Sequence, residues 1–161
     1  MKPRLIALLA GAAAIALVAA GCGSSDDSTT TASITKSQLI KQGDAICEAG
    51  NEEINEGFES FPGLKENKEP TEAQQTEITK TILLPSVQKQ IDEIRALGAP
   101  SGEEEEVTEI LDTVEGAVEE GEEDPTSFFE EEGGGVFEEG NKMAQEYGFK
   151  VCGNEEEEEE G

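Results

Sequence analysis

Thiol and carboxylate side chains are the two groups in this sequence that could carry chemistry. It has three cysteines, no histidine, and 38 acidic residues against 11 basic ones, for a formal net charge of −27. Thiols can be acylated, joined as a disulfide or bound to a metal, whereas carboxylates can act in pairs on glycosides or bind calcium. The absence of histidine excludes imidazole metal ligands and every catalytic triad or dyad with a histidine base. The acidic balance excludes a protein that follows nucleic-acid phosphates, because such proteins need Lys and Arg.

The first 22 residues have the pattern of an export signal. Lys2 and Arg4 precede an apolar stretch of residues 5–20, which is shorter than a bilayer-spanning helix and ends in small residues. The sequence Val-Ala-Ala-Gly-Cys that closes this segment resembles the lipobox of bacterial lipoproteins. This resemblance implies cleavage between Gly21 and Cys22, a diacylglyceryl thioether on Cys22, and an extracytoplasmic protein held to the membrane by lipid. The alternatives are an ordinary cleaved leader or an uncleaved membrane helix, with Cys22 unmodified.

Composition divides the chain into four parts. We expect a lipoprotein signal peptide at 1–21, a lipidated cysteine and flexible Ser/Thr-rich tether at 22–34, a helical domain at 35–153 and an acidic disordered tail at 154–161. Without the leader, the remaining 140 residues have a more negative net charge, −29. Leu, Ile, Val and Phe make up only about 19% of those residues, so the core is expected to be thin.

The two cysteines other than Cys22 are predicted to form a disulfide. An exported protein meets an oxidising environment, where Cys47 and Cys152 would close a loop of about a hundred residues. The chain-entropy treatment gives such a cross-link about 4–5 kcal/mol of stabilisation. A redox-active pair and a pair of metal ligands are the alternatives, but there is no Cys-x-x-Cys motif and no histidine to complete a zinc site.

The helical domain is predicted from apolar residues that recur with a period near 3.6, and no alternating strand pattern appears. Four helices are expected near 35–61, 71–97, 101–123 and 136–147, joined by short loops as an antiparallel bundle. Thr35 with Gln38 and Ser101 with Glu104 have the spacing of capping boxes. Pro85 interrupts the second pattern, where it either kinks the helix or starts a new one.

The sequence around the two paired cysteines carries a second resemblance. The segment Tyr147–Gly153, together with Asp44–Cys47, resembles small helical lipoproteins of actinobacteria whose function is unknown. The resemblance implies the same helical fold and cysteine pairing. It implies no activity.

The acidic residues are spread unevenly, which directs the prediction of function. Residues 35–100 hold 12 acids and 7 bases, whereas residues 96–141 hold 17 acids and no base. We therefore predict a non-enzymatic, lipid-anchored protein without cofactor, metal ligands or catalytic residues. Its acidic surface would serve a binding or spacing role at the cell envelope, with a cationic protein or another cationic envelope component as partner.

Two other functions remain open for the acidic residues. Clusters at 103–106, 119–124 and 130–132 could make a module that responds to calcium or another cation, although none has the spacing of an EF-hand loop. A carboxylate-based hydrolase would need one acid in an apolar pocket beside a second, ionised acid. Most acids here fall on the polar sides of amphipathic helices, which disfavours the hydrolase.

Overall fold

Helices account for all the regular structure in residues 33–64, 69–129 and 135–154, the parts of the chain that the computed structural model describes. The α-helices, in chain order, are α1 (Lys36–Ser60), α2 (Glu72–Ile78), α3 (Leu84–Leu97), α4 (Glu104–Glu123) and α5 (Glu138–Tyr147). A π-helical segment, Thr79–Leu83, joins α2 to α3, and two 3-10 turns, Ser127–Phe129 and Gly135–Phe137, lie between α4 and α5.

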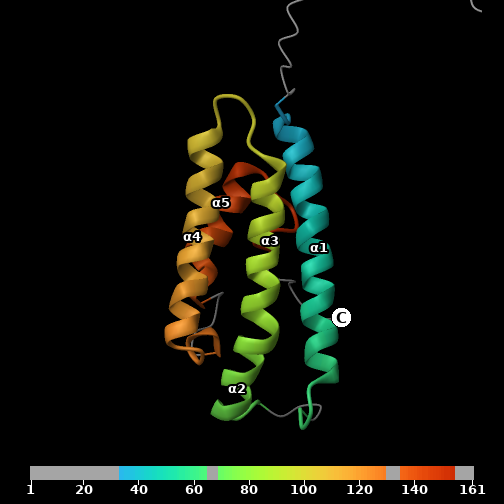
Figure 1. The fold of residues 1–161 in the computed structure, drawn as a ribbon, viewed down its shortest axis with the longest axis vertical. Coiled ribbons are helices and arrows are strands. Elements are labelled where there is room, and N and C mark those ends of the chain that lie inside the picture. Colours follow the sequence, from blue (N-terminus) through green and yellow to red (C-terminus); the bar gives the residue numbers. More distant parts are fainter. Residues whose placement is uncertain (1–32, 65–68, 130–134, 155–161) are drawn as a thin grey trace, which may run out of the picture. The chain divides into compact units, whose positions relative to one another are not determined.

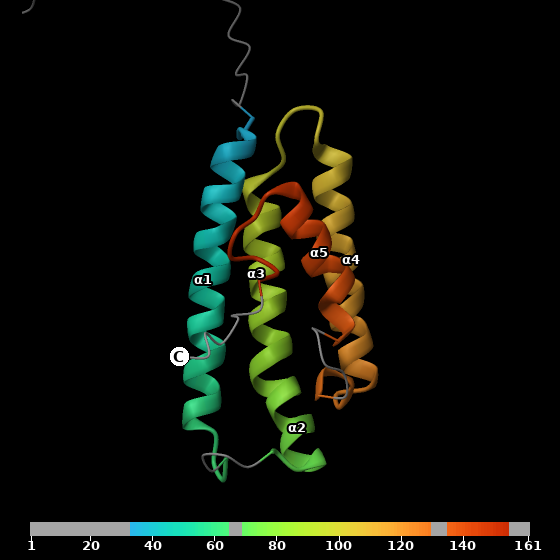
Figure 2. The same cartoon turned by 180° about the vertical axis from the view of Figure 1, so that it is seen from behind.

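The helices form an antiparallel bundle, as the sequence predicted. The chain reverses direction between α1, the α2–α3 rod, α4 and α5 (Figure 1). Helix α1 packs against α3, α3 against α4, and α4 against α5. Seen from behind, α5 and the segment after it lie across the α3 side of the bundle (Figure 2). Residues 31–161 form one compact unit with its own apolar core, so they are the folding unit of the chain.

Helix α1 begins with the predicted capping box. The Gln38 backbone N–H donates to the Thr35 hydroxyl at 3.3 Å, and the Thr35 N–H donates to the Gln38 side-chain oxygen at 3.0 Å. These bonds satisfy amide groups that the first turn of a helix otherwise leaves without partners. The helix buries Leu39 completely and Cys47 almost completely against the rest of the core.

Three glycines let α1 approach its neighbours closely. Gly43, Gly50 and Gly57 are seven residues apart and therefore share one side of the helix. A Cβ atom at Gly43 would lie 2.5 Å from the Phe149 ring, and one at Gly57 would lie 2.7 Å from Ile82. The absence of these side chains sets the spacing of the helices.

The hydrogen-bond register changes just ahead of Pro85, and a new α-helix, α3, begins there, which is one of the two alternatives predicted from the sequence. The Leu84 N–H donates to the Thr79 carbonyl, five residues back, and Pro85 then stands in the first turn of α3. A missing N–H is tolerated there. The π segment also buries Thr79, whose hydroxyl donates to the Pro125 carbonyl at 2.7 Å and so ties the rod to the end of α4.

The predicted capping box at the start of α4 is wrong. Residues 100–103 form a turn, with Gly102 at φ +89° and the Glu103 N–H donating to the Pro100 carbonyl at 3.0 Å. The left-handed glycine places Ser101 outside the helix, which starts at Glu104. The Glu104 carboxylate accepts instead from the Gly102 N–H at 2.7 Å.

The end of the domain folds back onto α1. Gly148, at φ +121°, ends α5, and the chain then turns so that Phe149 is buried. Cys152 forms the predicted disulfide with Cys47, with an S–S distance of 2.07 Å and a Cα–Cα distance of 5.3 Å. The all-α bundle with one disulfide is therefore confirmed.

Candidate functional site

The acidic residues that the structure describes all lie at the surface. None is buried, and most are exposed. On α4 a row of exposed carboxylates follows steps of three and four residues, with Gly116 as its one gap. We call this row the acidic stripe; it consists of Glu105, Glu109, Asp112, Glu119 and Glu123. The opposite side of α4 carries Val107, Ile110 and Val118 into the core. The periodicity that buries one side of α4 thus gathers the charge on the other.

Arg95 of α3 is the base that meets this part of α4. Its guanidinium donates to Asp112 at 3.1 Å and to Glu115 at 2.8 Å. The bond from Arg95 holds the pKa of the Glu115 carboxyl below its ordinary value and raises the pKa of the guanidinium. Because these groups are exposed, the pair adds only about 0.5 kcal/mol to stability. Arg95 does not neutralise the other carboxylates of the acidic stripe.

A cluster of three side chains joins the starts of α1 and α4 to the end of α5. The Tyr147 hydroxyl donates to Glu103 at 2.7 Å, and the Lys36 ammonium lies 3.4 Å from the same carboxylate. That ammonium also lies 3.7 Å from the centre of the Tyr147 ring. Burial, and then the bond to Glu103, raises the pKa of Tyr147 well above its ordinary value.

Asp44 holds the segment that follows α5. Its carboxylate accepts from the backbone N–H groups of Lys150 and Val151 at 2.9 Å each, and from that of Cys152 at 3.4 Å. Together with the disulfide one turn further along α1, these bonds fix residues 149–154 against the bundle. No sequence pattern indicated this role for Asp44 beyond its position three residues before Cys47.

A cavity of about 200 Å³ lies inside the bundle. Its walls come from α1, α3, α4, α5, Phe137 and residues 149–154, and the disulfide forms part of one wall. Most of the lining is aliphatic or aromatic, including Ile91, Ile94 and Leu111. None of the described residues that line it is charged.

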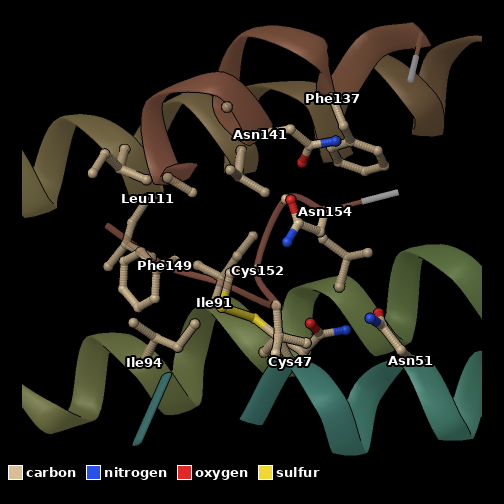
Figure 3. A pocket seen from close by; sticks show the side chains of 18 of the residues that line it. Cys47, Asn51, Ile91, Ile94, Leu111, Phe137, Asn141, Phe149, Cys152 and Asn154 are labelled. Atoms are coloured by element: carbon tan, nitrogen blue, oxygen red, sulfur yellow. A yellow bond between two sulfur atoms is a disulfide. The ribbon is translucent and has the colours of Figure 1, made fainter. Parts of the chain in front are cut away.

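The two ends of the cavity differ in chemistry. Figure 3 shows Ile94, Leu111 and Phe149 around one end, whereas the amide side chains of Asn51, Asn141 and Asn154 lie toward the other. Asn51 and Asn154 also border a neighbouring hollow at the surface, so the amide end is the one that faces solvent. The Asn154 amide donates to the Lys150 carbonyl, whereas the side-chain amides of Asn51 and Asn141 make no hydrogen bond to another described residue.

The amide end was not anticipated from the sequence. Asn51 and Asn141 come from α1 and α5, Asn154 comes from the segment after α5, and no spacing along the chain relates them. An isolated Asn or Gln on the border of an amphipathic helix carries no pattern of its own. These side chains become a site only through the packing of α1, α5 and residues 149–154.

Other predicted site residues lie outside the described parts of the chain. Gly21 and Cys22, with the expected cleavage and lipidation, belong to this group, as do the acids 130–132 and most of the predicted tail. In the residues that the structure does describe, no three Cys, Asp or Glu side chains are grouped so as to hold a metal ion. Within the same ranges, every helix falls short of the length and apolar character needed to cross a bilayer.

Comparison with known proteins does not add to this description. No family model, curated protein or solved structure matches the chain.

Proposed function

We propose that the protein is a lipid-anchored, extracytoplasmic and non-enzymatic domain that presents the acidic stripe to a cationic protein or another cationic component of the cell envelope. The leader and Cys22 supply the anchor, through the resemblance to the lipobox. The Ser/Thr-rich tether of about a dozen residues has a root-mean-square reach on the order of 20 Å, which lets the domain stand off the headgroups. The anchor and the stripe together define a surface protein with one strongly charged side.

One observation carries this proposal: the acidic stripe runs along α4 without a basic residue in α4 itself. Like charges three and four residues apart on a helix repel one another and destabilise it. A cationic partner would relieve that repulsion while adding its own attraction. Such a surface raises the association rate of a positively charged partner more than its residence time, and salt screens the effect.

The surface is tested by charge removal with a matched control. A variant with Glu105→Gln, Glu109→Gln and Glu119→Gln removes three of the five charges of the stripe, and one with Glu52→Gln, Glu56→Gln and Glu59→Gln makes the same charge change on exposed positions of α1. Crosslinking on intact cells should recover a partner with the wild-type protein and with the α1 variant, and much less of it with the α4 variant. Recovery that falls equally in both variants, or no reproducible partner at all, would contradict the role of the stripe.

The anchor is tested separately through Cys22. Cys22→Ser should abolish incorporation of a labelled fatty acid and leave the leader uncleaved at residue 21, because lipobox processing depends on the modified thiol. Cys22→Ala should behave in the same way, since neither side chain can form the thioether. Labelling that persists in both variants would remove the lipoprotein assignment and leave the α4 experiment untouched.

A further inference from the structure

We propose that the cavity inside the bundle is a binding site for one small, uncharged molecule with an apolar body and a single hydrogen-bonding group. This binding is separate from the proposed role of the acidic stripe, which lies on the opposite, solvent side of α4.

The size of the cavity points to a ligand. Protein interiors are close-packed and contain few voids larger than a water molecule. The cavity is partly open to solvent, and its volume of about 200 Å³ exceeds the roughly 150 Å³ of an apolar cavity known to take up benzene. The volume suits one molecule of roughly seven to ten non-hydrogen atoms.

The lining sets the charge and polarity of that ligand. No charged side chain is found among the described residues around the cavity, so an ionic group would lose its hydration without gaining a partner. The end formed by Ile94, Leu111 and Phe149 accepts an apolar body (Figure 3). The amides of Asn51 and Asn141 at the other end can donate to or accept from a hydroxyl or carbonyl group.

The walls are held open by contacts that do not depend on a ligand. The disulfide and the three backbone bonds to Asp44 fix the wall made by residues 149–154. Gly153, at φ +76°, lets this wall pass close to the backbone of Asn141, where a Cβ would lie 2.7 Å from the Asn141 carbonyl oxygen. A covalently fixed wall keeps the cavity preformed, which lowers the cost of binding.

The test uses residues 23–161, which contain the whole folding unit, and two probes of the same shape: toluene, and p-cresol, which adds a hydroxyl. Methyl NMR spectra of the protein are recorded as each probe is added. We expect saturable one-to-one binding that shifts the methyl signals of Ile91, Ile94 and Leu111. The signal of Ile78, which is fully buried but does not line the cavity, should not move.

Cavity filling supplies the decisive variant and its control. Ala144 is buried and lines the cavity, so Ala144→Leu places three more carbon atoms in the space the probes need. Ala96 is exposed on α3, and Ala96→Leu makes the same change outside the cavity. We expect Ala144→Leu to weaken both probes at least tenfold and Ala96→Leu to leave both unchanged. If Ala144→Leu does not fold, Val87→Ile with Val114→Ile fills the same space by smaller steps.

The amide end is tested by Asn141→Leu, which keeps the size of the side chain but removes its hydrogen-bonding group. We expect p-cresol to lose roughly fivefold in affinity and toluene to lose none, because a neutral hydrogen bond is worth about 1 kcal/mol. No saturable shift with either probe would overturn the proposal. Wild-type affinity in Ala144→Leu would also overturn it, since binding would then lie elsewhere.

Discussion

Reduction of the Cys47–Cys152 disulfide is expected to remove a large part of the stability of the domain. The two cysteines are 105 residues apart, so the bond closes almost the entire described domain into one loop. In the chain-entropy treatment a loop of this size contributes about 4.7 kcal/mol, because the open chain gains freedom only when it is unfolded. Both side chains are nearly buried, at 6% and 8% exposure. The reduced thiols can therefore stay packed, and the loss comes mainly from the unfolded state.

The size of the domain converts this figure into measurable shifts. Unfolding entropy of about 2.1 cal/mol/K per residue over roughly 120 residues implies that Tm falls by about 15–20 °C on reduction. With an m-value near 1.5 kcal/mol/M, the urea midpoint falls by about 3 M. Since typical domains have only 5–15 kcal/mol of stability, the reduced form is expected to be marginal.

Urea titrations followed by circular dichroism, on residues 23–161 with and without reductant, measure this difference directly. The double variant Cys47→Ala, Cys152→Ala is the control, because reductant should not change its midpoint. Intact mass under both conditions checks that the pair is oxidised at the start. A difference below about 1 kcal/mol between the two forms would refute the reasoning, as would two free thiols in the untreated protein.

Three further predictions concern single contacts. Gly121→Ala directs a methyl group at the Phe128 ring and should lower the free energy of unfolding by about 2 kcal/mol. Gly116→Ala, on the same helix, meets nothing within 4 Å and should raise the free energy of unfolding by up to about 1 kcal/mol. Urea titration compares the two variants, and equal effects would contradict the packing of Gly121 against Phe128. Asp44→Ala leaves three backbone N–H groups without their acceptor and should lower the free energy of unfolding by about 2 kcal/mol. Asp44→Asn keeps one acceptor oxygen and should lower it by about half as much. If Asp44→Ala left the stability unchanged, Asp44 would not hold residues 150–152 as described. The pKa of Tyr147 is raised in the folded state. The contribution of its protonated hydroxyl to folding stability is therefore complete below the pKa of about 10 in the unfolded chain, and it is lost as the pH rises from there through the folded-state pKa. Tyr147 is the chain's single tyrosine and there is no tryptophan, so ultraviolet absorbance follows this ionisation alone; titration near pH 10 in a protein still folded would contradict the burial.

The structure separates the acidic residues into two groups. Across the described residues, the acids that are only partly exposed are Asp44, Glu103 and Glu115, and each of them has a structural partner. The remaining acids there are exposed, and those of the stripe lie along one side of α4. The surface is thus divided between a few carboxylates that hold the fold together and many that face solvent.

Local sequence patterns predicted a good part of this molecule. The capping box at Thr35, the end of α5 at Gly148 and the buried side of α4 follow from spacing and backbone preference within one helix, where neighbours along the chain are also neighbours in space. The same local logic failed at Ser101, because Gly102 adopted a left-handed turn that the pattern of Ser and Glu did not reveal. Local patterns did not decide the backbone conformation at Pro85, because a π segment is one of several ways to accommodate a proline. The choice among them depends on where Thr79 is buried.

By itself, the sequence determined the helical class and the side of α4 on which charge collects, since a period of 3.6 residues suffices for both. It also predicted the pairing of Cys47 with Cys152, through the assignment of Cys22 to a lipid. Only the tertiary structure decided that Asp44 binds the backbone of residues 150–152 and that amides from α1, α5 and the segment after α5 meet at one end of a cavity. The physical reason is that these groups are separated by tens of residues along the chain. Their distances depend on how close glycines such as Gly43 allow the helices to pack, and that is a property of the whole bundle.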